Sequence, residues 1–270
     1  MTFIEALVLG IVQGLTEFLP ISSSAHLVLV PELFGWEQPS LPYVVLLHAG
    51  TLLALVVYFR RELAALAAGV FRPGPERRLA IVLALGTIPA AIIGVAFEEQ
   101  FEEAFGHPKQ VAIQLVLSGL ILVAAEALTR RNDKRDDTSS DVEGTEQMAR
   151  RLTWGSALGV GFAQALAIVP GISRSGATIA AGLLAGLSRP MAARFSFLLS
   201  IPILLGTSVF EVPKLSGTHP GAAALIAGFV ASTISGYAAI AGMIAFLQRR
   251  GLLSFAAYCV VVGGIFVLLV

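Results

Sequence analysis

Eight apolar segments constrain the fold of this chain more than any other feature of its sequence. Six of them are uninterrupted and about as long as the roughly 20 helical residues that one membrane crossing requires. The chain is also 56% hydrophobic and 13% charged, whereas soluble domains are about 25% charged. The sequence therefore predicts an all-α polytopic membrane protein, with a single integral membrane domain over residues 1–270. The uninterrupted segments are residues 41–59, 79–97, 111–128, 191–210, 222–247 and 252–270.

The other two apolar segments, residues 2–34 and 154–187, do not fit a single crossing. As one helix, each would be about 50 Å long at 1.5 Å per residue, whereas the hydrocarbon core of a bilayer is roughly 30 Å thick. Each segment is too short for two crossings with a turn, and each is interrupted near its centre by a proline and several serines. We therefore expect two re-entrant hairpins, in which two half-helices enter and leave the membrane by the same face.

The distribution of basic residues supports this topology. If both hairpins are re-entrant, fifteen of the 18 lysines and arginines fall on one side of the membrane, which the positive-inside rule assigns to the cytoplasm. Lys109 and Lys214 fall on the other side with both termini, and Arg174 lies within the membrane. The fifteen are Arg60, Arg61, Arg72, Arg77, Arg78, Arg130, Arg131, Lys134, Arg135, Arg150, Arg151, Arg189, Arg194, Arg249 and Arg250.

The same topology predicts two inverted repeats. Each half of the chain contains one hairpin followed by three spans, and three is odd, so the second half is inverted relative to the first. We expect the first repeat at residues 1–128, a polar cytoplasmic linker at 129–151 that is solvated and mobile, and the second repeat at 152–270. Inverted repeats with broken helices place their functional site near the middle of the membrane, where the two hairpin tips would face each other.

The first hairpin contains the sequence "QGLTEFLPISSSAH", residues 13–26. Gln13 and Glu17 are four residues apart and share one face of a helix. Their oxygen atoms suit a hard divalent cation such as Mg²⁺, or Ca²⁺, with water and a substrate phosphate as further ligands. With a single cysteine, Cys259, the sequence offers no multi-cysteine zinc site.

Three serines follow Pro20 in this hairpin, at the start of the second half-helix. Serine is a favoured N-cap residue, and the free N–H groups of a helix N-terminus bind anions. His26 lies over the same turn, because it follows two of the serines at helical spacing. The sequence therefore predicts an anion-binding turn formed by Ser22, Ser23 and Ser24 beside His26.

The second hairpin repeats this pattern as "PGISRSG", residues 170–176. Ser173 and Ser175 flank Arg174, and Gly171 and Gly176 allow the backbone to approach a ligand closely. An arginine within the membrane usually faces a partner or an aqueous cavity. Next to hydroxyl groups at a helix N-terminus it suits phosphate, which it can bind through two parallel hydrogen bonds.

These residues also have purely structural interpretations. An ion pair between Arg174 and Glu17 could serve the fold alone, but two opposed serine turns and a histidine would then have no explanation. His48, in the first uninterrupted span, has no neighbouring motif, and we interpret it as a packing residue or a residue that supports the site from behind. A net charge of zero gives no indication of nucleic-acid binding.

The two motifs together resemble those of the undecaprenyl-diphosphate phosphatase family, also called the bacitracin-resistance protein family. The resemblance extends over essentially the whole chain. It implies a multi-pass enzyme of the bacterial inner membrane that hydrolyses undecaprenyl diphosphate to the monophosphate. This reaction recycles the lipid carrier of peptidoglycan synthesis and confers bacitracin resistance. The resemblance also implies a divalent cation and a site that opens to the periplasm.

The resemblance assigns roles to individual residues. The family's acidic pair falls on Gln13 and Glu17, its serine and histidine on Ser23 and His26, and its phosphate-binding arginine on Arg174, flanked by Ser173. Many members have glutamate where this chain has Gln13. The glutamine keeps an oxygen ligand but lacks the negative charge of glutamate.

Three mechanisms remain open at the level of sequence. His26 could activate Ser23 as the nucleophile, activate a water molecule, or attack the phosphorus itself. A lipid-phosphate flippase or transporter using the same anion site is the rival function, and a non-catalytic scaffold leaves Arg174 unexplained. The expected partners are the lipid bilayer and a polyprenyl diphosphate, with bacitracin competing by binding that substrate. Whether the chain is a monomer or a homodimer stays open.

Overall fold

A computed structural model describes residues 1–97, 104–129, 141–211 and 221–270, and these residues form twelve α-helices without a β-strand. The chain is therefore all-α, as expected. The helices are α1 (Phe3–Phe18), α2 (Ser23–Phe34), α3 (Leu41–Tyr58), α4 (Arg60–Gly69), α5 (Pro75–Ala96), α7 (Pro108–Thr129), α8 (Asp141–Arg151), α9 (Trp154–Leu166), α10 (Arg174–Leu184), α11 (Arg189–Glu211), α12 (Ala222–Leu247) and α13 (Leu253–Leu269).

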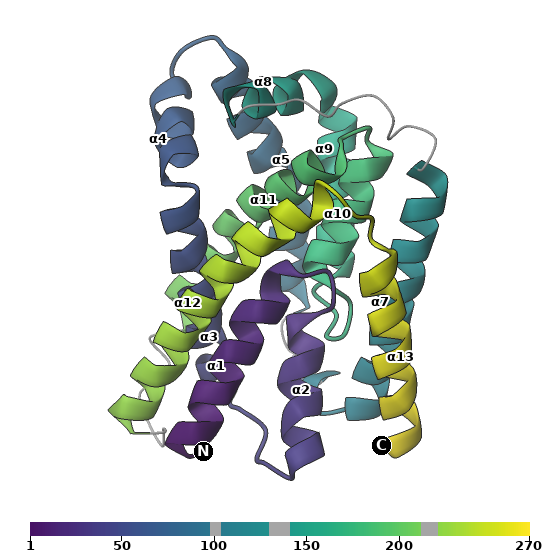
Figure 1. Cartoon of the computed structure of the whole chain (residues 1–270). Helices are drawn as coiled ribbons and strands as arrows, with labels where there is room; N and C mark the ends of the chain where they lie inside the picture. Colours follow the sequence, from purple (N-terminus) through teal and green to yellow (C-terminus); the bar gives the residue numbers. More distant parts are fainter. Residues whose placement is uncertain (98–103, 130–140, 212–220) are drawn as a thin grey trace.

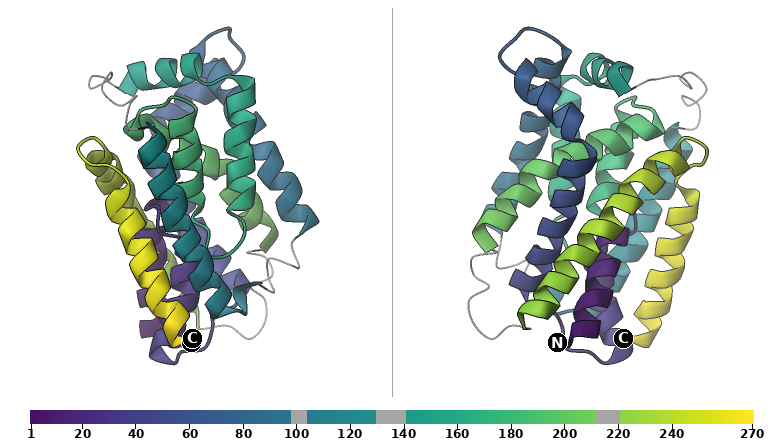
Figure 2. Two further views of the ribbon diagram at one scale, coloured as in Figure 1. Left: turned by 90° about the vertical axis from the view of Figure 1, so that its right-hand side faces the viewer. Right: turned by 60° about the vertical axis from the view of Figure 1, so that its left-hand side comes forward.

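Long apolar helices occupy the positions of the six predicted spans. Among the described residues, five helices are long and apolar enough to cross a membrane, namely α3, α5, α7, α11 and α12. The last predicted span, residues 252–270, is the apolar helix α13 of 17 residues. It lies along α7 (Figure 2, left). The expected polytopic membrane protein is confirmed at this level.

The two interrupted segments each form a pair of short helices. A four-residue connection, 19–22, joins α1 to α2, and residues 167–173 join α9 to α10. In Figure 1, α1 and α2 reach from the end of the molecule that contains both chain termini only as far as its middle. The α9–α10 connection approaches them from the opposite side. The tips of the two hairpins consequently meet in the interior.

Helix α1 is held in place by a seam of small residues. It packs along α12 with Gly14 against the backbone of that helix, where an added Cβ would lie 2.7 Å from the Gly236 nitrogen. Small residues allow such close approach of backbones in membrane proteins. This seam fixes the position of α1 along α12 and its rotation about its own axis. The side chains of its last turn are thereby placed as well.

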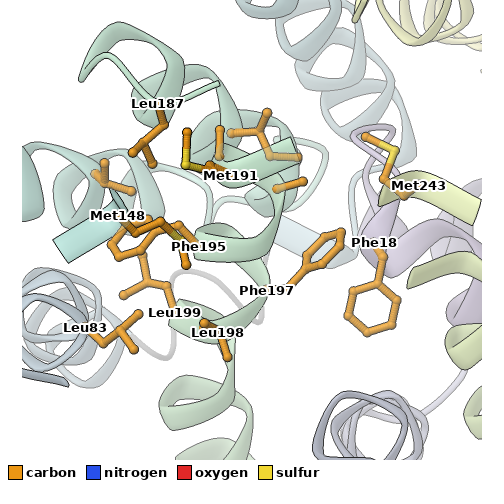
Figure 3. Close-up of a cluster of buried hydrophobic side chains, with 14 of the residues drawn as sticks. Phe18, Leu83, Met148, Leu187, Met191, Phe195, Phe197, Leu198, Leu199 and Met243 are labelled. Atoms are coloured by element: carbon orange, nitrogen blue, oxygen red, sulfur yellow. The ribbon is translucent and has the colours of Figure 1, made fainter. Parts of the chain in front are cut away.

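The largest apolar cluster surrounds α11 (Figure 3). Phe197 of α11 packs edge-on against Phe18, with ring centroids 5.3 Å apart. On the other hairpin, the Thr178 and Ser196 hydroxyls lie 2.5 Å apart, so that α10 is also held to α11. Helix α11 therefore supports both hairpin tips from behind.

Two helices in the polar loops were not predicted, α4 and α8. Both lie at the end of the molecule away from the chain termini (Figure 1). The expectation of a mobile loop at residues 129–151 is wrong for the described part. Residue 129 belongs to α7, 141–151 form α8, and Met148 and Ala149 are buried in the core. Both side chains belong to the largest apolar cluster, and α8 packs against α5 and α11. Residues 130–140 and Lys214 lie outside the described residues.

Candidate active site

The carboxylate of Glu17 is the centre of the site. Glu17 lies in the last turn of α1 and is 5% exposed. Its Oε1 accepts a hydrogen bond from Arg174 Nη2 at 2.6 Å. Its Oε2 accepts hydrogen bonds from Ser23 Oγ at 2.5 Å and from Gln13 Nε2 at 2.9 Å. His48 Nε2 lies 3.4 Å from the same oxygen. One carboxylate thus connects both hairpins and α3.

Arg174 is positioned by the start of α10. It is the first residue of that helix, and Ser173 is the N-cap, whose Oγ accepts a hydrogen bond from Gly176 N at 3.0 Å. Ser118 of α7 fixes the turn from outside: its hydroxyl accepts from Ser173 N at 2.9 Å and donates to the Gly171 carbonyl at 3.1 Å. The backbone that carries Arg174 is therefore held on both sides.

Two further hydrogen bonds join the hairpin tips directly. Ser24 Oγ accepts from Gly171 N at 3.1 Å, and Ser175 Oγ donates to the Leu19 carbonyl at 2.9 Å. Gly171 has φ +99° and lies so close to α7 that an added Cβ would be 2.7 Å from Gln114 Cβ. Only glycine combines this φ with such close packing. The expectation that the two motifs face each other is confirmed.

Ser22 forms the N-cap of α2 with an unusual backbone. Its φ is +67°, and among the described residues it is the one non-glycine residue with a positive φ. Its Oγ accepts a hydrogen bond from Ala25 N at 3.3 Å. Strained conformations of this kind concentrate at functional sites. The strain turns the backbone at Ser22 so that the next residue, Ser23, faces Glu17.

His26 is not directed at Ser23. Its Nδ1 lies 2.7 Å from the Ser22 carbonyl oxygen, and its Nε2 lies 2.7 Å from the hydroxyl of Tyr258. The rings of His26 and Tyr258 are also stacked, with centroids 5.7 Å apart and an interplanar angle of 10°. Both ring nitrogens are engaged, and the Ser23 hydroxyl donates to Glu17 instead.

Two buried polar atoms of the site have no hydrogen-bond partner, Arg174 Nη1 and Gln13 Oε1. Buried polar groups are nearly always paired, and an orphaned group needs a specific explanation. One atom is a cationic donor and the other a neutral oxygen acceptor. They fit an anion on the arginine side and a cation or a donor group on the glutamine side.

The oxygen atoms of Gln13 and Glu17 fit a divalent cation by their chemistry. Magnesium is commonly held by one or two carboxylates together with substrate phosphates, and the unpartnered Gln13 Oε1 supplies a second hard oxygen. Within the described part of the chain there is no group of three or more histidine, cysteine, aspartate or glutamate side chains that could hold a metal ion. A metal at this site would therefore depend on the substrate for much of its coordination.

Three residues of the site went unrecognised or were only partly recognised in the sequence. His48 was interpreted as packing or support, and it contacts Glu17. Ser118 and Tyr258 were not identified, because each lies in a mostly apolar helix without a neighbouring motif. The remaining predicted residues come together around Glu17 and the two hairpin turns, and their chemical roles stay predictions.

Comparison with known proteins shows the family to which the chain belongs. The model of a family described as bacitracin resistance protein BacA matches residues 6–265. An undecaprenyl-diphosphatase of Pelobacter propionicus is 40% identical, covering 98% of this chain and 96% of the relative. A protein of the same name from Moorella thermoacetica is 42% identical over 99% of this chain and 97% of its own length. Undecaprenyl-diphosphatase 2 of Stutzerimonas stutzeri is also 42% identical, over 100% and 98%. The chain belongs to the bacitracin resistance protein BacA family.

Proposed function

We propose that this protein hydrolyses undecaprenyl diphosphate to undecaprenyl phosphate and inorganic phosphate. The observation that carries the proposal is a serine hydroxyl donated to a buried carboxylate beside an arginine whose Nη1 has no partner. Hydrogen bonds to Glu17 join the three side chains, and they provide a nucleophile, a base and a phosphate-binding guanidinium group. The names of the relatives supply the identity of the lipid.

Ser23 is the nucleophile in this mechanism, and Glu17 is its general base. Ser23 Oγ attacks the terminal phosphorus and transfers its proton to Glu17, while the bond from phosphorus to the bridging oxygen breaks and undecaprenyl phosphate leaves. Water then hydrolyses the phosphoserine and releases inorganic phosphate. Arg174 binds the terminal phosphoryl oxygens through its free Nη1, and stabilises the charge that they carry in the transition state.

The serine and glycine residues of the two turns hold the anion cradle. Ser22 and Ser173 cap α2 and α10, while Ser24 and Ser175 tie one hairpin tip to the other. The proposed substrate contacts are the free backbone N–H groups of these helix starts, supported by the close approach that Gly171 and Gly176 permit. Both helix dipoles favour a negative charge at this point.

A divalent cation completes the proposed site. Gln13 and Glu17 would hold Mg²⁺, or Ca²⁺, and when bound it would neutralise charge on the diphosphate. The carboxylate of Glu17 already accepts hydrogen bonds from Arg174, Ser23 and Gln13. One of these hydrogen bonds would have to break if the cation binds Glu17 directly.

We also propose that residues 1–128 and 152–270 are inverted repeats with re-entrant hairpins in a bacterial inner membrane. Both termini would face the periplasm, onto which the site would open. Two observations support this orientation. Both chain ends lie at one end of the molecule, and the arginine-bearing helices α4 and α8 lie at the other (Figure 1). A site open to the periplasm would act on lipid diphosphate to which bacitracin also binds.

Phosphate release by the purified protein tests the proposed activity. The protein in detergent micelles with Mg²⁺ should convert undecaprenyl diphosphate to equal amounts of the monophosphate and inorganic phosphate. The Ser23→Ala protein, prepared in the same way, is the control for contaminating phosphatases. A pure lipid carrier would bind the substrate and release no phosphate, and this result would reject the proposed function.

A further inference from the structure

The hydroxyl of Tyr258 forms a hydrogen bond with His26 that none of the proposed chemical steps uses. Tyr258 belongs to α13, the last helix, and lies 232 residues from its partner in sequence. The two side chains share the 2.7 Å contact between Tyr258 Oη and His26 Nε2 and a nearly parallel ring stack. The Tyr258 side chain therefore constrains the imidazole ring through both its hydroxyl and its ring.

The contacts of His26 also define its tautomer. Its Nδ1 is 2.7 Å from the Ser22 carbonyl oxygen, which can only accept a hydrogen bond. Nδ1 must therefore carry the proton, and in the neutral ring Nε2 presents its lone pair. The hydroxyl of Tyr258 is then the donor to Nε2. The phenol thus occupies the one imidazole atom that could attack phosphorus or accept a proton.

Packing next to Tyr258 holds α13 against the first hairpin. The neighbouring residue Cys259 is fully buried, and its Sγ lies 3.6 Å from the Pro20 carbonyl oxygen in the turn between α1 and α2. Cys259 belongs to an apolar cluster that joins α13 to α2 and α7. Tyr258 itself is 40% exposed, so its side chain lies at the margin of the hairpin rather than in the core.

We infer that Tyr258 is a positioning residue that acts through His26. Its hydroxyl fixes the imidazole in the Nδ1–H tautomer and holds the ring beside the serine turn, with Nε2 engaged by the phenol rather than free to compete with Ser23. This inference rests on the proposed phosphatase activity for its effect on turnover. The contact itself is independent of that activity and can be measured without it.

Nitrogen NMR of the imidazole rings tests the contact directly. The chain has four histidines, and the signals lost in the His26→Ala protein identify those of His26 in a sample labelled with ¹⁵N-histidine. The wild type should show a protonated Nδ1 and an unprotonated Nε2 that accepts a hydrogen bond. Tyr258→Phe keeps the aromatic stack but removes the donor, and it should move the Nε2 signal. Tyr237→Phe on α12 is the matched control and should leave both signals unchanged.

Turnover measurements test whether the contact acts through His26. Tyr258→Phe should lower kcat by about three- to tenfold, the range expected for one hydrogen bond, and Tyr258→Ala should lower it further because the stack is also lost. In a His26→Ala background, Tyr258→Phe should have no additional effect. An equal loss in both backgrounds would overturn the inference, because Tyr258 would then act without His26.

The two measurements separate the failure of this inference from that of the proposed function. An Nε2 signal that does not move in Tyr258→Phe overturns the positioning role, whatever the turnover. A wild-type protein that releases no phosphate rejects the phosphatase activity, and the NMR result alone then decides whether Tyr258 fixes His26. The same holds if His26→Ala leaves too little turnover for the double-mutant comparison.

Discussion

Ser23 donates its hydroxyl hydrogen to Glu17 Oε2 at 2.5 Å. It does so although His26 follows three residues later, and histidine is the side chain that most often serves as a general base. His26 lies on the same helix, but its two nitrogens contact the Ser22 carbonyl and the Tyr258 hydroxyl instead. This geometry favours the proposed mechanism, in which Ser23 attacks and Glu17 takes its proton.

Alanine variants of Ser23 and His26 should consequently differ. Ser23→Ala removes the nucleophile and should abolish the phosphoenzyme and lower turnover by at least about a hundredfold, since acid–base assistance alone contributes 10²–10⁴. His26→Ala should lower turnover less, because in the proposed mechanism the imidazole neither attacks phosphorus nor takes the proton of Ser23. Rates of phosphate release and trapping of ³²P-labelled protein measure both effects. A phosphoenzyme on histidine in the Ser23→Ala protein would contradict this mechanism.

Arg174→Lys should be severely impaired although the positive charge is kept. Arg174 binds Glu17 through Nη2 and has Nη1 free for phosphate. A lysine has one ammonium group and cannot hold both partners in this planar arrangement. We expect kcat/KM to fall more than about tenfold, roughly 1.4 kcal/mol. Turnover close to wild type with lysine would mean that Arg174 supplies charge alone or serves the fold.

Most of this site could be predicted from sequence because its residues occur in two short motifs. Glu17 and Arg174 were expected to lie opposite each other from the placement of polar groups in interrupted apolar segments. Tyr258 and His48 could not be predicted, because their contribution depends on how α13 and α3 are rotated about their own axes. Each of these helices is apolar on nearly every face, so its sequence pattern does not determine that rotation. The helix α8 was missed for a related reason: Met148 is an isolated apolar signal in a highly charged segment.

The seam between α1 and α12 should be sensitive to a single methyl group. Gly14→Ala places a Cβ 2.7 Å from the Gly236 nitrogen, so the two helices must separate and shift the last turn of α1. We expect a lower melting temperature in detergent, by several degrees for about 1–3 kcal/mol of overpacking, together with lower turnover. Gly242→Ala on α12, where an added Cβ has open space around it, is the control and should have neither effect.

The proposed orientation can be tested with single cysteines. In a Cys259→Ser background, Ser40→Cys at the start of α3 and Phe71→Cys after α4 place thiols at exposed positions before and after one span. A membrane-impermeant thiol reagent should label Ser40→Cys in intact spheroplasts and Phe71→Cys only after lysis. The opposite result would place the termini in the cytoplasm, and labelling of both from one side would contradict the crossing by α3.

The last prediction concerns the divalent cation, and it depends on how Gln13 and Glu17 share one helix face. Glu17 is the only carboxylate of the first motif, and hard cations prefer charged oxygen ligands. Glu17→Gln should therefore nearly abolish turnover and raise the Mg²⁺ concentration needed for the half-maximal rate. Gln13→Glu adds a carboxylate beside Glu17, so activity should survive and less Mg²⁺ should be needed for the half-maximal rate.

In the absence of a cation, repulsion between the two carboxylates of the Gln13→Glu protein should destabilise it. Its melting temperature should therefore fall in EDTA and recover with Mg²⁺, a measurement that needs no assay of activity. The measurement is phosphate release against Mg²⁺ concentration for the wild type and both variants. If residual turnover of Glu17→Gln keeps the wild-type metal dependence, Glu17 is not a metal ligand, and its role is that of the base for Ser23 and the partner of Arg174.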